Sequence, residues 1–270
     1  MKQEPVHTMS TQAIAFPDPR EVRATVGEAE WAVREELAAA YRLAARFGWT
    51  DHIFTHFSAR IPGVHDYFLI NSYGLTFHEV SASNLVRIDI GGEVLYDPLG
   101  RGHNLAGYVI HGAIHSARPD LTCILHTHTT AGVAVSAQEN GLLTYLSQHA
   151  ARFHGHVAYH DYEGFAFNRE EQARLIRDIG AHRILILRNH GLLTAGGSIG
   201  EAFHHLYFLE RACGIQIAAQ AGGNALRQPA DAVVAEAATV YWRGVGGTYT
   251  DRTWQAFRRE LERNDDTFNL

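Results

Sequence analysis

The chain has 270 residues, 46% of them hydrophobic, and a formal net charge of −6 at pH 7. It contains no apolar run of the roughly 18 residues that a membrane-spanning helix needs, and no block of Lys and Arg that would attract nucleic acid. We therefore expect one large domain or two small ones, with neither a membrane nor a nucleic acid as a partner.

The N-terminal segment and the two cysteines bear on where the protein works. Residues 1–20 are polar, contain Pro17 and Pro19, and lack the basic-then-apolar order of a secretory signal, so we interpret them as an arm or a disordered lead-in. Two cysteines do not make a disulfide framework, and we expect both Cys123 and Cys213 in the core. A reducing cytoplasm is therefore the expected location.

The first half of the chain is predicted to form two helices with short strands between them. Apolar residues recur at helical spacing over 33–47, and Gly48 follows as a stop signal. A second helix over 104–117 stops near Pro119. Gly91-Gly92 joins the last two of four strand-like runs as a hairpin. These runs cover residues 54–61, 67–71, 85–90 and 93–96.

The second half is predicted to alternate between strands and helices. Asn168 with Glu171, and Ser198 with Glu201, have the spacing of capping boxes at two helix starts. Strands are expected at 121–126, 156–159, 184–187 and 192–195, and helices at 131–137, 170–179, 198–221, 229–241 and 251–262. This pattern predicts an α/β fold, with helices on both sides of a sheet and a helical tail.

His126-Thr127-His128 is the most informative motif. It ends a predicted buried strand, and residues two apart on an extended chain point to the same side, so both imidazoles can bind one cation. His190 follows the apolar run 184–187 in the same way. Three histidines at strand ends leave a coordination position open, as catalytic metal sites do. The alternative is that these are ordinary packed or solvated side chains, since the chain has 18 His.

Five motifs in the same order resemble the class II aldolase/adducin family over roughly residues 28–221. They are Thr55-His56-Phe57-Ser58-Ala59-Arg60, Leu69-Ile70-Asn71-Ser72-Tyr73-Gly74, Ala117-Arg118-Pro119-Asp120, His126-Thr127-His128 and Arg188-Asn189-His190-Gly191. The resemblance implies a layered α/β/α domain with a central, mainly antiparallel sheet over residues 26–222. An N-terminal arm would cover residues 1–25, and a helical C-terminal extension residues 223–270.

The resemblance also implies a cofactor and an assembly. It makes His126, His128 and His190 the ligands of a divalent metal that stabilises an enolate as a Lewis acid. Zn²⁺ is the expected ion, although imidazole also suits Fe²⁺, Mn²⁺ and Co²⁺. The expected assembly is a homo-oligomer, a tetramer, with the active site near a subunit interface.

One departure from the family pattern changes the expected substrate. Its sugar-phosphate aldolases carry Ser-Ser-Glu before the first metal histidine, and this chain has Leu105-Ala106-Gly107 at that spacing. The Glu is their catalytic acid/base, and the serines help to bind phosphate. Thr55-His56 also replaces a Gly-Asn of the phosphate pocket. We therefore expect a substrate without phosphate and place the chain in the adducin-like branch, which residues 74–83 and 159–164 also resemble.

Three residues are candidates to replace the missing acid/base. His111 and His115 are four apart and share one face of the predicted helix 104–117, and Tyr108 lies one turn before His111. Each can transfer protons near neutral pH. The alternative is that they only support the metal ligands from behind.

The expected substrate-binding residues come from the early motifs. Arg60 offers a planar fork that matches a carboxylate, and its competing role is an intersubunit ion pair. The other expected substrate contacts are Asn71, Ser72, Tyr73 and Gly74. Six further histidines are interpreted as scaffold, packing or surface residues, namely His149, His154, His156, His160, His204 and His205. The alternative is that one of the first four enters the pocket.

Three functions are compatible with these residues. The first is a divalent-metal-dependent lyase, of aldolase or decarboxylase type, that acts on a small non-phosphorylated hydroxy or oxo acid or carbonyl compound through a metal-stabilised enolate. The second is a non-haem Fe(II) oxygenase that uses the same three histidines. The third is a non-catalytic, adducin-like binding scaffold, against which the retained open metal site weighs.

Overall fold

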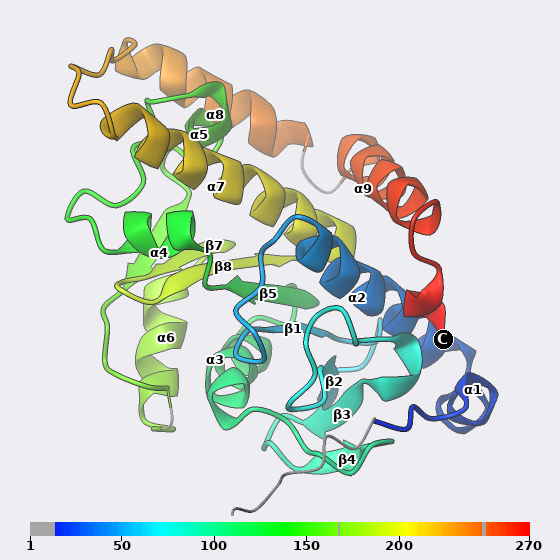
Figure 1. The fold of residues 1–270 in the computed structure, drawn as a ribbon. Helices are drawn as coiled ribbons and strands as arrows, with labels where there is room; N and C mark the ends of the chain where they lie inside the picture. The colour runs from blue at the N-terminus through cyan, green and yellow to red at the C-terminus, as the bar shows by residue number, and fades with distance from the viewer. Residues whose placement is uncertain (1–13, 167, 245–246) are drawn as a thin grey trace, which may run out of the picture.

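The computed structural model describes residues 14–166, 168–244 and 247–270 (Figure 1). Its strands are β1 (His56–Ala59), β2 (Tyr67–Ile70), β3 (Val86–Asp89), β4 (Val94–Tyr96), β5 (Cys123–Thr127), β6 (Val157–His160), β7 (Ile184–Leu187) and β8 (Gly191–Gly196). They form one sheet in the order β4-β3-β2-β1-β5-β8-β7-β6. Every neighbouring pair is antiparallel except β6 and β7, which are parallel. The expected mainly antiparallel sheet is confirmed.

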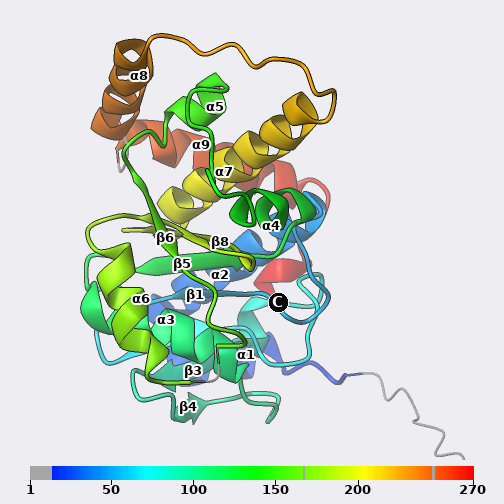
Figure 2. The same ribbon diagram turned by 90° about the vertical axis from the view of Figure 1, so that its left-hand side faces the viewer.

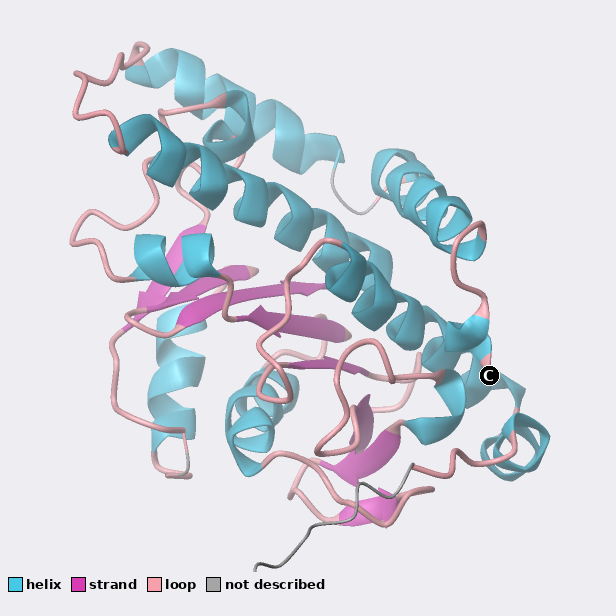
Figure 3. Ribbon diagram, in the orientation of Figure 1, coloured by secondary structure: helices cyan, strands magenta, loops and turns pink. Residues whose placement is uncertain are grey.

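Helices cover both faces of this sheet (Figures 1 and 2). The α-helices of the described residues are α1 (Pro19–Val26), α2 (Glu28–Arg46), α3 (Leu105–Ala117), α4 (Thr130–Ser136), α5 (Gln148–Ala151), α6 (Glu171–Ile179), α7 (Ile199–Gln220), α8 (Asp231–Gly244) and α9 (Thr248–Glu262). Figure 3 shows α3 and α6 on one face, with α2, α4 and α7 on the other. The layered α/β/α fold and the helical C-terminal region are therefore confirmed.

Strand alternation divides the core between the two faces. In β5, Cys123 and Leu125 pack in the apolar cluster that α2 and α7 complete, whereas Ile124 packs in the cluster that α3 and α6 complete. Successive residues of a strand point to opposite faces, so His126 lies on the α3 face with Ile124, and Thr127 on the α7 face. Both cysteines are buried, as expected.

The N-terminal region is more ordered than the expected arm. Asp18 caps α1 by accepting a hydrogen bond from Arg20 N at 2.9 Å, and Val22 packs with Trp31 and Ala82. Residues 1–13 of the predicted arm lie outside the described residues. At the other end, α9 packs on α7, with Trp254 5.5 Å from Phe203 between ring centroids. The division of the chain near residues 26 and 222 stays a prediction.

Neither predicted capping box forms completely. Asn168 Oδ1 accepts from Glu170 N rather than from Glu171, whose carboxylate lies 3.4 Å from His160 Nε2. Ser198 Oγ accepts from Glu201 N at 3.1 Å as expected, but the Glu201 carboxylate accepts from Gly197 N at 3.2 Å. Glu171 has a tertiary partner in His160, and Glu201 has one in Arg183 besides its local contact with Gly197. Among the described helices, none has the length and apolar content needed to cross a membrane.

Candidate metal centre and cavity

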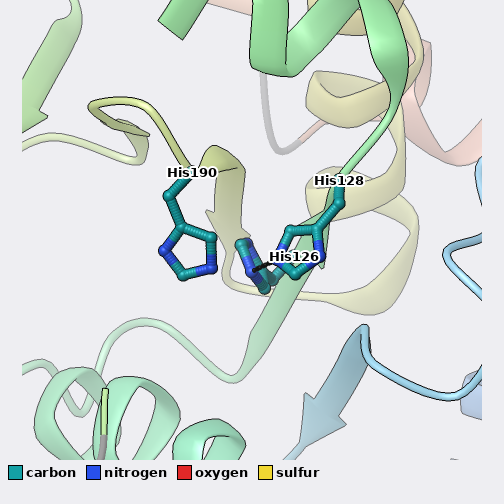
Figure 4. A group of neighbouring side chains, drawn as sticks. All are labelled: His126, His128 and His190. Atoms are coloured by element: carbon teal, nitrogen blue, oxygen red, sulfur yellow. Dashed lines mark hydrogen bonds between the residues drawn. The ribbon is translucent and has the colours of Figure 1, made fainter. Parts of the chain in front are cut away.

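The three histidines expected at a metal centre lie together in the structure (Figure 4). His126 and His128 come from the end of β5, and His190 comes from the turn between β7 and β8. One ring nitrogen from each can be chosen so that all three atoms lie within 4.8 Å of one another. This spacing allows one cation to reach all three.

The local chain conformation brings these segments close. β5 pairs with β8, so that Thr127 faces Leu192, and a tight turn joins β7 to β8. Asn189 in that turn has φ 55°, a left-handed conformation that Asn tolerates better than most residues. A Cβ at Gly191 would lie 2.3 Å from Thr127 O, so only glycine permits this approach. The backbone conformation thus favours Asn before His190 and requires Gly after it.

Hydrogen bonds orient two of the imidazoles towards each other. His126 Nδ1 lies 2.9 Å from Leu192 O, and His128 Nδ1 lies 2.9 Å from Asp51 Oδ2. A carbonyl and a carboxylate only accept, so both Nδ1 atoms donate a proton to these partners, and in a neutral imidazole the Nε2 atom then carries the lone pair. These Nε2 atoms are 2.8 Å apart. Two neutral rings oriented in this way would direct both Nε2 lone pairs at one cation, so the donor set fits a divalent metal of the zinc type.

Burial keeps the imidazoles of His126 and His190 neutral. Removal from water, followed by the nearby histidines, lowers the pKa of His126 well below its ordinary value. The same causes lower the pKa of His190 to about 4. Neutral imidazole is the form that binds metal, so neither nitrogen would need to lose a proton near neutral pH.

Glu210 of α7 holds the segment from the opposite face. Its carboxylate accepts hydrogen bonds from Thr127 Oγ1 at 2.5 Å and from Thr129 Oγ1 at 2.6 Å. Burial raises the pKa of Glu210 to about 7. The two threonines flank His128, so this clamp fixes the direction in which the imidazole points. The sequence signal for this contact is a Glu within the apolar part of a long helix.

A cavity of about 600 Å³ opens beside the three histidines. His128, His190 and Asp51 line one side of it, and His56 of β1 lines the same side. In the β1–β5 register His56 faces His126, with ring centroids 5.1 Å apart. His56 was not predicted as a site residue, because the sequence does not reveal which strand pairs with β5.

His56 is the first member of a buried chain of polar side chains. Its Nδ1 lies 2.9 Å from His111 Nε2, and His111 Nδ1 lies 2.5 Å from Ser58 Oγ. Ser58 Oγ also lies 2.8 Å from His115 Nε2. Burial lowers the pKa of His56, His111 and His115 well below the ordinary value. The predicted candidate His111 is therefore one layer behind the cavity wall, and His115 is farther away.

The other acid/base candidate lies outside the cavity. The Tyr108 hydroxyl donates to Ile90 O at 3.1 Å. Its ring fills the space above Gly92 and Gly112, where an added Cβ would meet it at 2.9 Å. These contacts give Tyr108 a packing role outside the cavity lining, and proton transfer by Tyr108 stays a prediction.

Most of the predicted substrate contacts lie outside the cavity lining and stay predictions. Arg60 follows β1 at the end away from His56, and four residues of extended chain span roughly 13 Å. Its guanidinium donates to His115 O. Asn71 Oδ1 accepts from the Tyr41 hydroxyl at 2.9 Å in the core. Of the five residues predicted to bind substrate, Tyr73 lines the cavity, whereas Arg60, Asn71, Ser72 and Gly74 do not.

Comparison with known proteins gives the chain a family. Residues 35–217 match the model of the class II aldolase and adducin N-terminal domain. A Pseudomonas aeruginosa protein, whose name gives a provisional aldolase class 2 assignment, is 48% identical over 250 residues, covering 92% of this chain and 95% of its own. Rat alpha-adducin is 44% identical over 195 residues, covering 71% of this chain and 26% of its own.

Two solved structures are also similar. An aldolase II superfamily protein from Pseudomonas syringae superposes with a TM-score of 0.89 at 53% identity, over 93% of this chain and 100% of that one. L-fuculose 1-phosphate aldolase from Glaciozyma antarctica superposes with a TM-score of 0.74 at 26% identity, over 94% and 96%. At a coarse level this kinship supports a metal-dependent, aldolase-like lyase. The chain belongs to the class II aldolase and adducin family.

Proposed function

We propose that the protein is a divalent-metal-dependent lyase, of aldolase or decarboxylase type, for a small non-phosphorylated hydroxy or oxo acid or carbonyl compound. The observation that carries this proposal is the group of three histidine nitrogens within 4.8 Å of one another, with the Nε2 atoms of His126 and His128 2.8 Å apart, beside a cavity of about 600 Å³. His126, His128 and His190 would hold the ion, with Zn²⁺ first and Fe²⁺, Mn²⁺ or Co²⁺ as alternatives. When bound, it supplies Lewis-acid stabilisation of the charge that develops as a C–C bond breaks.

His56 is the group we assign to proton transfer. It lines the cavity, and its Nδ1 is tied to His111, so the other ring nitrogen is oriented by a fixed partner. A Cβ on Gly107 would lie 2.8 Å from His56 Cδ2. The ring therefore occupies the space into which a side chain at 107 would project, the position that matches the aldolase glutamate. This packing supports His56, with His111 behind it, as the replacement.

A deuterium-exchange experiment tests this proposal without knowledge of the natural substrate. Zinc-loaded protein is incubated in D₂O with an α-hydroxy ketone, and proton NMR follows loss of the proton α to the carbonyl. We expect exchange with the native protein and none with His128→Ala. His56→Gln should keep its metal but exchange about 100-fold more slowly. His111→Ala should also keep its metal and slow the exchange.

The possible results separate the claims. No exchange by the loaded native protein, with any of a panel of ketones, contradicts the lyase proposal. Unchanged exchange in His56→Gln removes that residue from proton transfer. Unchanged exchange in His111→Ala removes the predicted role of His111.

Two other functions are separated by metal analysis. The same imidazoles suit Fe²⁺, so an oxygenase is the second candidate; zinc in anaerobically purified protein, with no O₂ uptake, eliminates it. Kinship with adducin favours a binding scaffold as the third. Stoichiometric metal and substrate-dependent exchange contradict a scaffold without catalysis. A homotetramer in a reducing cytoplasm, with the cavity near a subunit interface, completes the proposal.

A further inference from the structure

Much of the cavity lining is apolar. Phe54, Ala106, Ile110, Val133, Phe165 and Ala166 belong to it, beside the polar Asn104 and Asn189. A volume of about 600 Å³ falls within the roughly 300–1,000 Å³ of small-molecule sites. The cavity therefore has room for more of a ligand than the oxygen atoms that would bind the metal. The part of a ligand that extends beyond the metal would therefore meet hydrocarbon.

Positive charge is missing from this lining. Among the described residues no Lys or Arg lines the cavity, and Asp51 places a carboxylate there. Two arginines close in sequence to the lining residues do not line the cavity, and both bond to backbone carbonyls. Arg101 Nε donates to Tyr73 O at 3.1 Å, and Arg188 Nη1 donates to Gln138 O at 2.7 Å. A phosphate or carboxylate on the distant part of a ligand would lose hydration without gaining a cationic partner.

Aromatic rings gather where the cavity meets the surface. Phe54, Tyr73, Tyr162 and Phe165 line it and are all exposed, Phe54 at 50% and Phe165 at 81%. Exposed apolar side chains that cluster beside a site mark a surface that binds apolar partners. Aromatic side chains supply large contact area and prefer flat or apolar groups.

Resting on the proposed function, we propose that the substrate carries an uncharged, aryl-sized apolar group on the side away from its metal-binding oxygens. The apolar lining and aromatic rim bind this group, while the histidine side binds the oxygen pair. The site thereby selects against sugar phosphates and against compounds with a second, distant carboxylate.

Three hydroxamates with the same chelating head test this inference. They are acetohydroxamate, phenylacetohydroxamate and phosphonoacetohydroxamate, which differ only by a hydrogen, a phenyl or a phosphonate on one carbon. Binding to the zinc-loaded protein is measured by titration calorimetry. We expect the phenyl compound to bind about tenfold or more tightly than the methyl compound, because a ring of apolar surface is buried. The phosphonate should bind no more tightly than the methyl compound.

A pair of phenylalanine variants locates the effect. Phe54→Ser removes a ring at the cavity, and Phe16→Ser removes an equally exposed ring that lies outside it, since both side chains are 50% exposed. Phe54→Ser should lose most of the phenyl preference, and Phe16→Ser should keep it. Both rings are at the surface, so neither change opens a hole in the core.

The outcomes distinguish the inference from the function on which it depends. Equal binding of the three compounds, or tightest binding of the phosphonate, overturns the apolar-substrate inference and leaves the metal centre in place. Binding of none of them overturns both. If Phe54→Ser keeps the phenyl preference but lowers the oligomer mass in light scattering, the rim contacts a second copy of the chain and the inference is wrong.

Discussion

Two groups of histidines show what distinguishes a candidate ligand site from packing. At the cavity, His126 and His128 each direct Nδ1 at a fixed acceptor, which leaves Nε2 facing a common point. On α7, both ring nitrogens of His204 lack a hydrogen-bond partner among the described residues, and the ring stacks on Tyr241 with 5.8 Å between centroids. Its neighbour His205 bonds through Nδ1 to the Tyr241 hydroxyl at 2.8 Å.

Burial alone does not separate these two groups. It lowers the pKa of His204 and His205 to about 3, and that of His190 to about 4, so these three imidazoles are neutral near pH 7. The difference lies in the acceptors that orient the rings and in the cavity beside them. We infer that neutral imidazoles can bind a metal when hydrogen-bond acceptors at their Nδ1 atoms orient the Nε2 lone pairs towards a common position.

The largest expected effect is loss of metal from His128→Ala. Two imidazoles would remain, and the orienting bond to Asp51 would disappear with the third. Bound zinc after dialysis, measured by plasma mass spectrometry, should fall from stoichiometric to residual, while circular dichroism shows an intact fold. His204→Phe, which replaces a buried ring of similar size on α7, should keep its zinc. Full occupancy in His128→Ala would refute the ligand assignment.

A smaller effect is expected when only the orienting acceptor is removed. Asp51→Ala leaves three imidazoles but frees the ring of His128, so zinc affinity should fall about 10- to 100-fold. The matched control is Asp178→Ala, since Asp178 bonds to His160 Nδ1 at 2.7 Å away from the cavity. Competition with a chromogenic chelator measures both affinities. An equal loss in the two variants would mean that the fold, and not the orientation of His128, sets the affinity.

The sequence predicted that the three histidines lie together, and part of this grouping depends on local geometry. Period-two alternation placed His126 and His128 on one side of a strand end, and the Asn-His-Gly turn placed His190 after a second strand. Helical spacing likewise put His111 and His115 on one face, where both approach Ser58 Oγ. The part of the fold that this helix face contacts could not be predicted. His111 was expected to act at the site, but His56 lines the cavity and His111 lies behind it.

Contacts between distant segments account for the remaining differences. Asp51, the carbonyl of Leu192 and the Glu210 clamp reach the site only through the order of strands in the sheet and the packing of α7. The distance of Arg60 from the three histidines could not be predicted for a related reason. Its motif predicts a strand but not which end of that strand lies near these histidines. The chemistry of single side chains could thus be predicted from the local sequence. The direction of each strand or helix, and the elements packed beside it, could not be predicted without the fold.

The smallest expected effect concerns pH and the α7 histidines. The pKa of His204 is about 3 in the folded chain against an ordinary value of 6.5, so the unfolded chain binds more protons between these values. The stability that this neutral ring contributes is complete above pH 6.5 and is lost as pH falls towards 3. The slope from one such group approaches about 1.4 kcal/mol per pH unit. Urea unfolding at pH 7.5, 6.0 and 5.0 should therefore show a shallower pH dependence in His204→Phe than in the native protein.

A second histidine substitution controls for the added phenyl ring. His78 is exposed, so His78→Phe changes the composition in the same way without removing a buried imidazole. Its unfolding free energy should keep the native slope against pH. If His204→Phe also keeps that slope, the ring of His204 is hydrated or bonded in solution. The contrast between the α7 pair and the cavity trio would then rest on the orienting acceptors alone, which the two metal-binding predictions test separately.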